Sequence, residues 1–105
     1  MAITQQTVRD VWQKAQFVDA QNEAKGFRKD QCGAWIQWSQ YGNRNSAYGW
    51  EIDHVTPVSR GGSDHVSNLR PLHWENNAAR GDGQLVCVVA SNGTSNAATS
   101  AASYR

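Results

Sequence analysis

The chain has 105 residues, of which 39% are hydrophobic, and a formal net charge of +1 at pH 7. This length fits one domain built around a single core. A charge so close to neutral excludes a strongly basic protein that coats nucleic acid, so any affinity for phosphate must come from locally placed side chains or a bound cation. No stretch has the length and hydrophobicity of a signal peptide or a membrane span, and we therefore expect a cytoplasmic protein.

The first predicted element is a helix over residues 7–25. Its apolar residues recur at helical spacing, namely Val8, Val11, Trp12, Ala15 and Val18. Thr7 is the predicted N-cap, and Gly26 is the predicted end of the helix. We expect the apolar face to pack on the rest of the domain, with a contact to a partner protein as the alternative.

Strand-like patterns follow. Trp35-Ile36 and Trp50-Ile52 are predicted strand segments, because aromatic residues and isoleucine lie there between turn-forming residues. Residues 50–55 alternate between apolar and polar, as a half-buried strand does. The five tryptophans of the chain are expected mainly in the core, because each can bury a large apolar area.

The next segment predicts a long loop, a second strand and a short helix. Pro57 and the turn residues 61–64 belong to the loop. Residues 68–72 form a short strand that we expect Pro71 to break, and a helix from residue 73 or 74 to Arg80 is stopped by Gly81. Residues 84–90 predict one more extended segment. Residues 91–105 are rich in Ala, Ser and Asn, and we expect a flexible tail.

The two cysteines, Cys32 and Cys87, are far apart and form no CxxC pair, which excludes a four-cysteine zinc site. A disulfide is one alternative. Without a secretion signal, two reduced and buried thiols are favoured.

An acid stands directly before a histidine at Asp53-His54, where the predicted strand ends. Hydrolysis of a phosphodiester needs a base for water, a metal ion to neutralise charge and groups that hold both in place. Asp53 offers an anionic oxygen, His54 an imidazole, and Asn68 and Asn77 neutral amides. Neighbouring side chains on a regular strand point to opposite faces. Asp53 and His54 must therefore lie at a strand end or act from different sides of a phosphate.

The stretch "IDHVTPVSRGGSDHVSNLRPLHWENNAARGD" resembles the HNH endonuclease motif, in which a strand ending in Asp-His is followed by a loop, an Asn-Leu strand and a helix. His54 and Asn68 are fourteen positions apart, and Asn68 and Asn77 are nine apart. The resemblance implies an α+β fold with a ββα-metal finger at about residues 50–83, an N-terminal helix and short antiparallel strands. The nuclease domain would span residues 1–90, with the tail at 91–105.

The resemblance also implies roles for single residues. Asp53 and Asn77 would hold a divalent metal ion, and their oxygen atoms suit Mg²⁺ most, with Mn²⁺ as a further choice. His54 would be the general base, and Asn68 would hold the loop and orient His54. Contacts to nucleic acid are expected from Arg80, His73, Arg60 and Arg70. For His73, packing or a phosphate contact is favoured over the alternative of metal ligation. The activity implied is hydrolysis of double-stranded DNA that leaves 5′-phosphate and 3′-hydroxyl ends.

The chain also departs from the common HNH pattern. Many such proteins carry structural CxxC pairs, and here His73 stands where one of those cysteines often falls. We therefore expect the finger to be held by packing alone, through Trp50, Ile52, Leu69, Leu72 and Trp74. A nucleic-acid-binding module that no longer cuts is the alternative function, and a protein-interaction domain is a third. Each of these functions fits a monomer or a small homo-oligomer. Each also fits a further partner, either an immunity protein or a phage or host protein.

Overall fold

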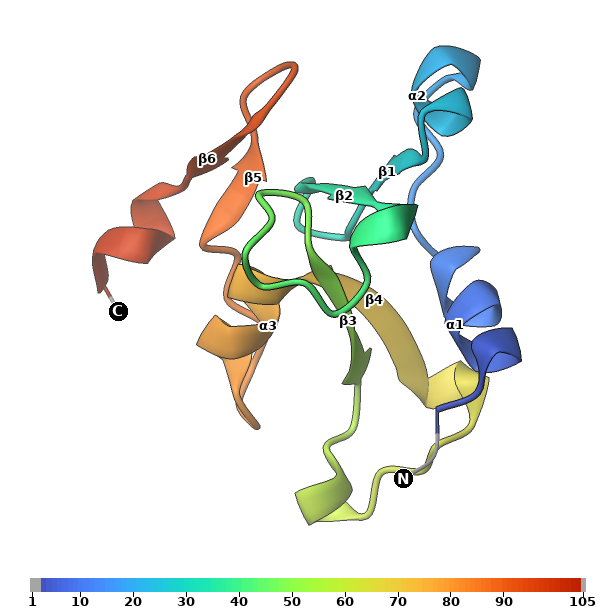
Figure 1. Ribbon diagram of the computed structural model, residues 1–105. Coiled ribbons are helices and arrows are strands. Elements are labelled where there is room, and N and C mark those ends of the chain that lie inside the picture. The colour runs from blue at the N-terminus through green and yellow to red at the C-terminus, as the bar shows by residue number, and fades with distance from the viewer. Residues whose placement is uncertain (1–2, 105) are drawn as a thin grey trace.

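The computed structural model describes residues 3–104 (Figure 1). The α-helices in this part of the chain are α1 (Gln5–Trp12), α2 (Ala20–Ala24) and α3 (Trp74–Arg80). The strands form three antiparallel pairs: β1 (Phe27–Lys29) with β2 (Trp35–Gln37), β3 (Trp50–His54) with β4 (Leu69–His73), and β5 (Val89–Ser91) with β6 (Asn96–Ala98). No helix among residues 3–104 is both long and apolar enough to cross a membrane. The predicted α+β class is confirmed.

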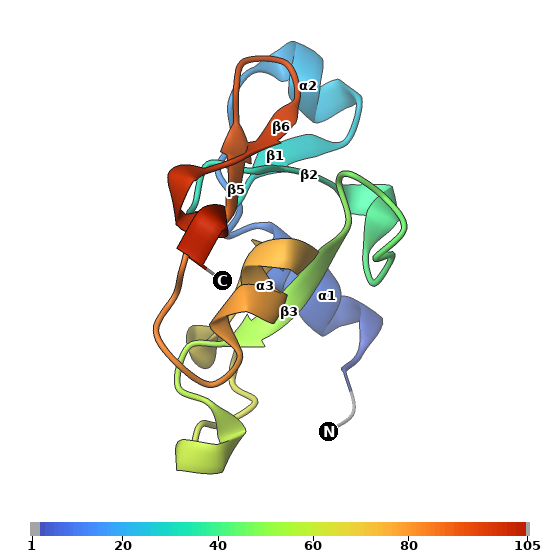
Figure 2. The same cartoon turned by 90° about the vertical axis from the view of Figure 1, so that its left-hand side faces the viewer.

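The β3–β4 hairpin lies at the centre, with α1 on one face and α3 on the other (Figures 1 and 2). Strand alternation explains this division, because Trp50, Ile52 and Leu69 lie on the face towards α1, whereas Glu51, Asp53 and Arg70 lie on the face towards α3. Trp50 and Leu69 belong to the cluster that contains the apolar face of α1. Strand, long loop, strand and helix thus follow each other as the sequence predicts.

The main core consists of buried residues from α1, the segment after it, β2 and the hairpin: Val8, Val11, Trp12, Ala15, Ile36, Trp50 and Leu69. Three of the five tryptophans, Trp12, Trp35 and Trp50, are buried, as expected from their size. Trp38 is 37% exposed, so the expectation does not hold for every one of them.

The single predicted helix over residues 7–25 is wrong, because the chain forms two short helices instead. α1 begins after Thr4, whose side chain accepts a hydrogen bond from the backbone of Thr7, so the N-cap is Thr4. The backbone of Gln16 pairs with that of Lys29 through two hydrogen bonds of 2.7 and 3.0 Å. Because of this pairing, the chain leaves the helical conformation after α1 and runs alongside β1. α2 starts anew after the N-cap Asp19.

The sequence predicts that Pro71 breaks the second strand of the finger, but β4 runs through it. Pro71 lies opposite Ile52 in the β3–β4 register. The sheet has only two strands, and a proline is tolerated in an edge strand wherever its missing N–H would point away from the partner strand.

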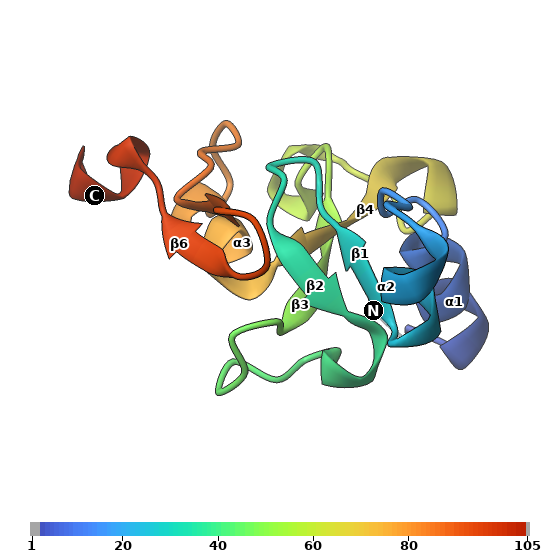
Figure 3. The same ribbon diagram turned by 90° about the horizontal axis from the view of Figure 1, so that it is seen from above.

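The segment expected to be a flexible tail has regular secondary structure. β5 and β6 form a hairpin, and residues 100–104 follow as a 3₁₀ turn. The hairpin lies beside the β1–β2 pair (Figures 2 and 3). Asn96 fixes it there, because its side chain accepts a hydrogen bond from the backbone N–H of Trp35 and donates one to the Trp35 carbonyl oxygen. The indole N–H of Trp35 also donates to the carbonyl oxygen of Gly93. These contacts join residues far apart in sequence, which composition does not reveal.

The favoured pair of reduced thiols is also wrong, since Cys32 and Cys87 form a disulfide. The bond connects the turn between β1 and β2 to the segment that precedes β5. It closes a loop with a sequence separation of 55 residues. A link over so many residues removes much of the conformational freedom of the unfolded chain.

A buried hydrogen-bond network around Asp30 holds the finger in addition to packing. Asp30 is 1% exposed, and its carboxylate accepts from the backbone N–H groups of Cys32, Ala34 and His73 and from the amide of Asn76. Asn76 is itself fully buried, donates to the carbonyl of Val89 and accepts from the backbone there. The expectation that packing alone holds the finger is therefore wrong.

Candidate functional site

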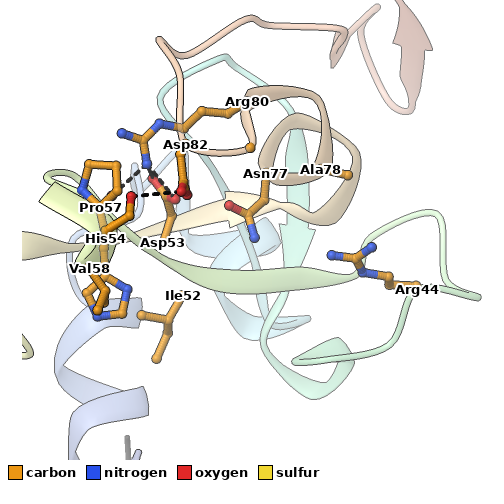
Figure 4. Close-up of a pocket in the computed structure, with 12 residues that line it drawn as sticks. Arg44, Ile52, Asp53, His54, Pro57, Val58, Asn77, Ala78, Arg80 and Asp82 are labelled. Atoms are coloured by element: carbon orange, nitrogen blue, oxygen red, sulfur yellow. Dashed lines mark hydrogen bonds and ion pairs between the residues drawn. The ribbon is translucent and has the colours of Figure 1, made fainter.

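The candidate site is a cavity of about 460 Å³ between the end of β3, the loop that follows it and α3 (Figure 4). Asp53 and His54 line it from β3, and Asn77 and Arg80 line it from α3. The cavity therefore brings together the carboxylate, the imidazole and the terminal amide that the sequence singles out.

Asp53 and His54 reach this cavity from different sides of the strand. Figure 4 shows Asp53 extending from β3 on the side of Asn77 and Arg80, whereas the ring of His54 extends from the other side, as Ile52 does. This is the alternation of a regular strand. The structure therefore has Asp53 and His54 on different sides of β3, at the point where this strand ends.

The Asp53 carboxylate is buried between two arginines. Its exposed fraction is 6%. Arg70, directly opposite Asp53 in the hairpin register, donates from Nε to Oδ2 at 2.7 Å. Arg80 approaches from α3, and its Nη1 lies 2.8 Å from Oδ1 and 3.0 Å from Oδ2. A buried carboxylate needs such partners because burial of an unpaired charge is costly. Asp53 therefore has an ordered, anionic position.

Asn77 is fixed from its nitrogen end. Its Nδ2 donates to Oε1 of Glu51 at 2.8 Å, and Glu51 is also held by Arg44, with Nε–Oε2 and Nη2–Oε1 distances of 2.6 and 2.8 Å. Burial acts to raise the pKa of Glu51, but the hydrogen bonds from Arg44 and Asn77 and the charge of Arg44 together leave this pKa below its ordinary value. Glu51 therefore acts as an ionised acceptor at neutral pH.

The oxygen atoms of Asp53 and Asn77 are of the kind that a hard divalent cation prefers, and both residues line the same cavity. An ionised carboxylate offers about four lone-pair sites, and the two arginines use three of them, so one site on Oδ1 is left. The oxygen of the Asn77 amide points to the side of Asp53 (Figure 4). Mg²⁺ is commonly bound through one or two such oxygens plus water and phosphate. No cluster of three or more His, Cys, Asp or Glu side chains occurs within residues 3–104, so the fit rests on this pair.

The imidazole of His54 makes one hydrogen bond within residues 3–104, between Nε2 and Oδ1 of Asp64 at 2.9 Å. Asp64 lies in the loop, and its side chain is 55% exposed, against 16% for His54. A carboxylate only accepts, so this contact places the imidazole proton on Nε2 and leaves Nδ1 as the acceptor. Within residues 3–104, no hydrogen bond reaches Nδ1. His54 thus has the tautomer that a general base requires.

Asn68 holds the loop but does not contact His54. Its amide donates to the carbonyl oxygens of Thr56 and Ser63 and accepts from the backbone N–H of Thr56. The loop also closes tightly at Gly62, where an added Cβ would lie 1.7 Å from the carbonyl oxygen of Thr56. Asn68 therefore holds the loop that carries Asp64, and its orienting effect on His54 stays a prediction.

The four residues expected to contact nucleic acid differ in their surroundings. His73 is 1% exposed and caps α3, with Nδ1 accepting from the backbone of Glu75, so of its two expected roles the structure shows packing. Arg80 is 9% exposed, and besides Asp53 it donates to the carbonyl oxygens of residues 54, 55 and 83. A contact from Arg80 to phosphate would have to release these bonds. Arg70 pairs with Asp53. Arg60 is exposed and donates to the backbone of Asp82 at the rim of the cavity.

Two further residues of this site, Glu51 and Asp64, are not identified by sequence reasoning. Glu51 stands two positions before Asp53, which on a strand means the same face, and this spacing is a usable signal. Asp64 is ten residues from His54 in a loop, and no periodicity relates them.

A family model described as HNH endonuclease matches residues 31–83, half of the chain. The match covers β2 to α3 and contains Asp53, His54, Asn68 and Asn77. No curated protein and no solved structure matches the chain.

Proposed function

Because the chain belongs to the HNH endonuclease family, we propose that it is a metal-dependent endonuclease that hydrolyses phosphodiester bonds in double-stranded DNA. The family consists of nucleases, with inactive members among them, and its nucleases generally use divalent metal ions. The observation that carries the proposal is the cavity of about 460 Å³, in which a carboxylate, an amide and an imidazole meet.

Asp53 and Asn77 would hold the ion, with Mg²⁺ as the first choice and Mn²⁺ as the second. When bound, such an ion neutralises negative charge that develops on the phosphate and on the departing 3′ oxygen. Arg70 and Arg80 hold the carboxylate of Asp53 in place through ion pairs of 2.7 and 2.8 Å.

His54 is the proposed general base. Its Nδ1 takes one proton from a water molecule as the water oxygen forms a bond to phosphorus. The bond between phosphorus and the 3′ oxygen breaks, and this oxygen leaves with the electron pair and takes a proton from solvent water. His54 then releases its own proton to solvent. The products are a 5′-phosphate and a 3′-hydroxyl. Asp64 stabilises the protonated imidazole through Nε2.

A divalent-metal screen on supercoiled plasmid tests the proposal. We expect nicked or linear product from the wild-type chain with Mg²⁺ or Mn²⁺. His54→Ala should lower the rate by about 10²–10⁴-fold, because this is the contribution of a general base, and Asn77→Ala should lower it through weaker metal binding. Cleavage by His54→Ala at the wild-type rate would remove His54 from this role.

One observation favours a second candidate, a nucleic-acid-binding module that does not cut. The Asp53 carboxylate is bonded to two arginines, as a purely structural carboxylate would be. Such a module would bind duplex DNA with an affinity that falls as salt concentration rises. It would leave plasmid intact in every divalent metal of the same screen.

A further inference from the structure

The side chain of Asn77 has two chemically different ends, and only one of them can bind a cation. The amide oxygen is an acceptor, whereas the NH₂ group is a donor with no free electron pair to offer. Rotation of the amide by half a turn would exchange the two. A role of Asn77 as a metal ligand therefore depends on what fixes its orientation.

Glu51 fixes this orientation. The distance from Nδ2 of Asn77 to Oε1 of Glu51 is 2.8 Å. An ionised carboxylate cannot donate, so the NH₂ group must face Glu51 and the oxygen must face the other way. Figure 4 shows the oxygen of Asn77 on the side of Asp53.

Glu51 is itself held from two directions. It belongs to β3, and the spacing of two residues puts it on the face of the strand that carries Asp53. Arg44 binds its carboxylate with both Nε and Nη2, and the guanidinium of Arg44 lies 5.9 Å from the ring centroid of Trp74. Paired N–H groups of this kind give a fixed geometry as well as energy. The acceptor for Asn77 is thus rigid before any ion binds.

We propose that Glu51 is a positioning residue, which turns the amide oxygen of Asn77 towards the place where a divalent cation binds between Asn77 and Asp53. The inference rests on the proposed function, since it assumes that Asn77 is a ligand. Without Glu51 the amide would rotate freely, and orientations with the NH₂ group towards the cation would compete.

The test measures Mn²⁺ affinity of the full chain by water-proton relaxation, with no DNA present. Glu51→Ala should bind Mn²⁺ about 10- to 100-fold more weakly, the range typical of residues that orient a metal ligand. Glu51→Gln should restore most of the affinity, because its side-chain oxygen can still accept from Asn77. Glu23→Ala is the matched control, because it also removes a carboxylate paired with an arginine, and it should bind as the wild type does. Thermal unfolding of each variant monitors the fold.

Each outcome has a separate meaning. Wild-type affinity in Glu51→Ala, with a loss in Asn77→Ala, would overturn the positioning role and leave the metal site. Equal losses in Glu51→Gln and Glu51→Ala would assign the effect to the charge of Glu51 and overturn the positioning role as well. If the wild type does not bind Mn²⁺, or if neither Asp53→Ala nor Asn77→Ala changes its affinity, the proposed ligand pair is wrong. The inference about Glu51 then fails with it.

Discussion

The two sides of β3 are built differently. On the side of α3, Asp53 is buried and receives three N–H contacts from two arginines, and Asn77 is tied to Glu51. On the other side, His54 has one hydrogen bond to Asp64, a loop residue whose side chain is 55% exposed. The half that would hold a metal ion thus has several side-chain hydrogen bonds, whereas the imidazole that would move a proton has one, to a loop residue. We therefore expect Asp53 to contribute more to stability, and its neighbour His54 to contribute more to the chemistry.

The largest expected effect tests whether the two sides of β3 differ in their contribution to stability, by removing one side chain from each. Asp53→Ala leaves two largely buried guanidinium groups without their carboxylate, and we expect a loss of about 3–5 kcal/mol in the free energy of unfolding. His54→Ala should cost less, about 1 kcal/mol, because it removes a single side-chain hydrogen bond, whose partner Asp64 is exposed. Urea unfolding of both variants measures the two values, and similar losses would mean that the two sides do not differ in stability.

The second prediction extends the comparison to the disulfide, which lies outside the cavity. The double variant Cys32→Ser, Cys87→Ser should lose about 2–4 kcal/mol of stability, because the unfolded chain gains conformational freedom. Plasmid cleavage at a temperature where the variant is folded should be unchanged, since neither cysteine lines the cavity. An unaltered urea midpoint would show that the Asp30 network holds the β1–β2 turn without help.

A smaller effect is expected at Asp64. Asp64→Ala removes the partner of Nε2 in His54, and the loss of one exposed hydrogen bond of about 0.5–1.5 kcal/mol corresponds to a roughly threefold to tenfold lower cleavage rate. Asp82→Ala is a suitable control, because Asp82 also lies at the cavity but its carboxylate bonds to Ser59 and not to His54. If both variants cleave alike, Asp64 has no special relation to the base.

The smallest effect concerns pH and a pair remote from the site. The hydrogen bond from Arg28 lowers the pKa of Glu23, against a small opposing effect of burial. Because the folded-state pKa is the lower one, the pair stabilises the fold above the unfolded pKa of about 4.3, and this contribution is lost as pH falls through the folded value. The pair is partly exposed, so the effect is small. Glu23→Gln should therefore flatten slightly the loss of thermal stability below a pH of about 4.3, and identical melting curves for both chains would contradict this.

Local patterns predict the finger well, because its parts are marked by local chemistry. Alternation marks β3, and the glycine after Arg80 marks the end of α3. The break between α1 and α2 could not be predicted, because it arises when Gln16 pairs with the distant Lys29. The C-terminal hairpin is equally non-local, since Asn96 bonds to the backbone of Trp35.

The candidate site could be predicted as a set of residues but not as a set of contacts. Asp53, His54 and Asn77 reach one cavity, as the spacing implies. The partners of Asp53 depend on hairpin register, which places Arg70 opposite it, and on the position of α3, which brings Arg80 to it. A sequence pattern gives neither the register nor the helix position, so both arginines appear in the sequence only as candidates for phosphate contacts.

Asp30, Asn76 and one disulfide support the finger, and this support affects how the protein responds to chelators and to reductants. We expect the protein to fold without zinc, because within residues 3–104 a disulfide and the buried hydrogen bonds of Asp30 support the finger. A chelator would therefore strip any catalytic ion and leave the architecture intact, whereas a strong thiol reductant would weaken the architecture without touching the ligands. Loss of activity and loss of structure can thus be brought about by different reagents.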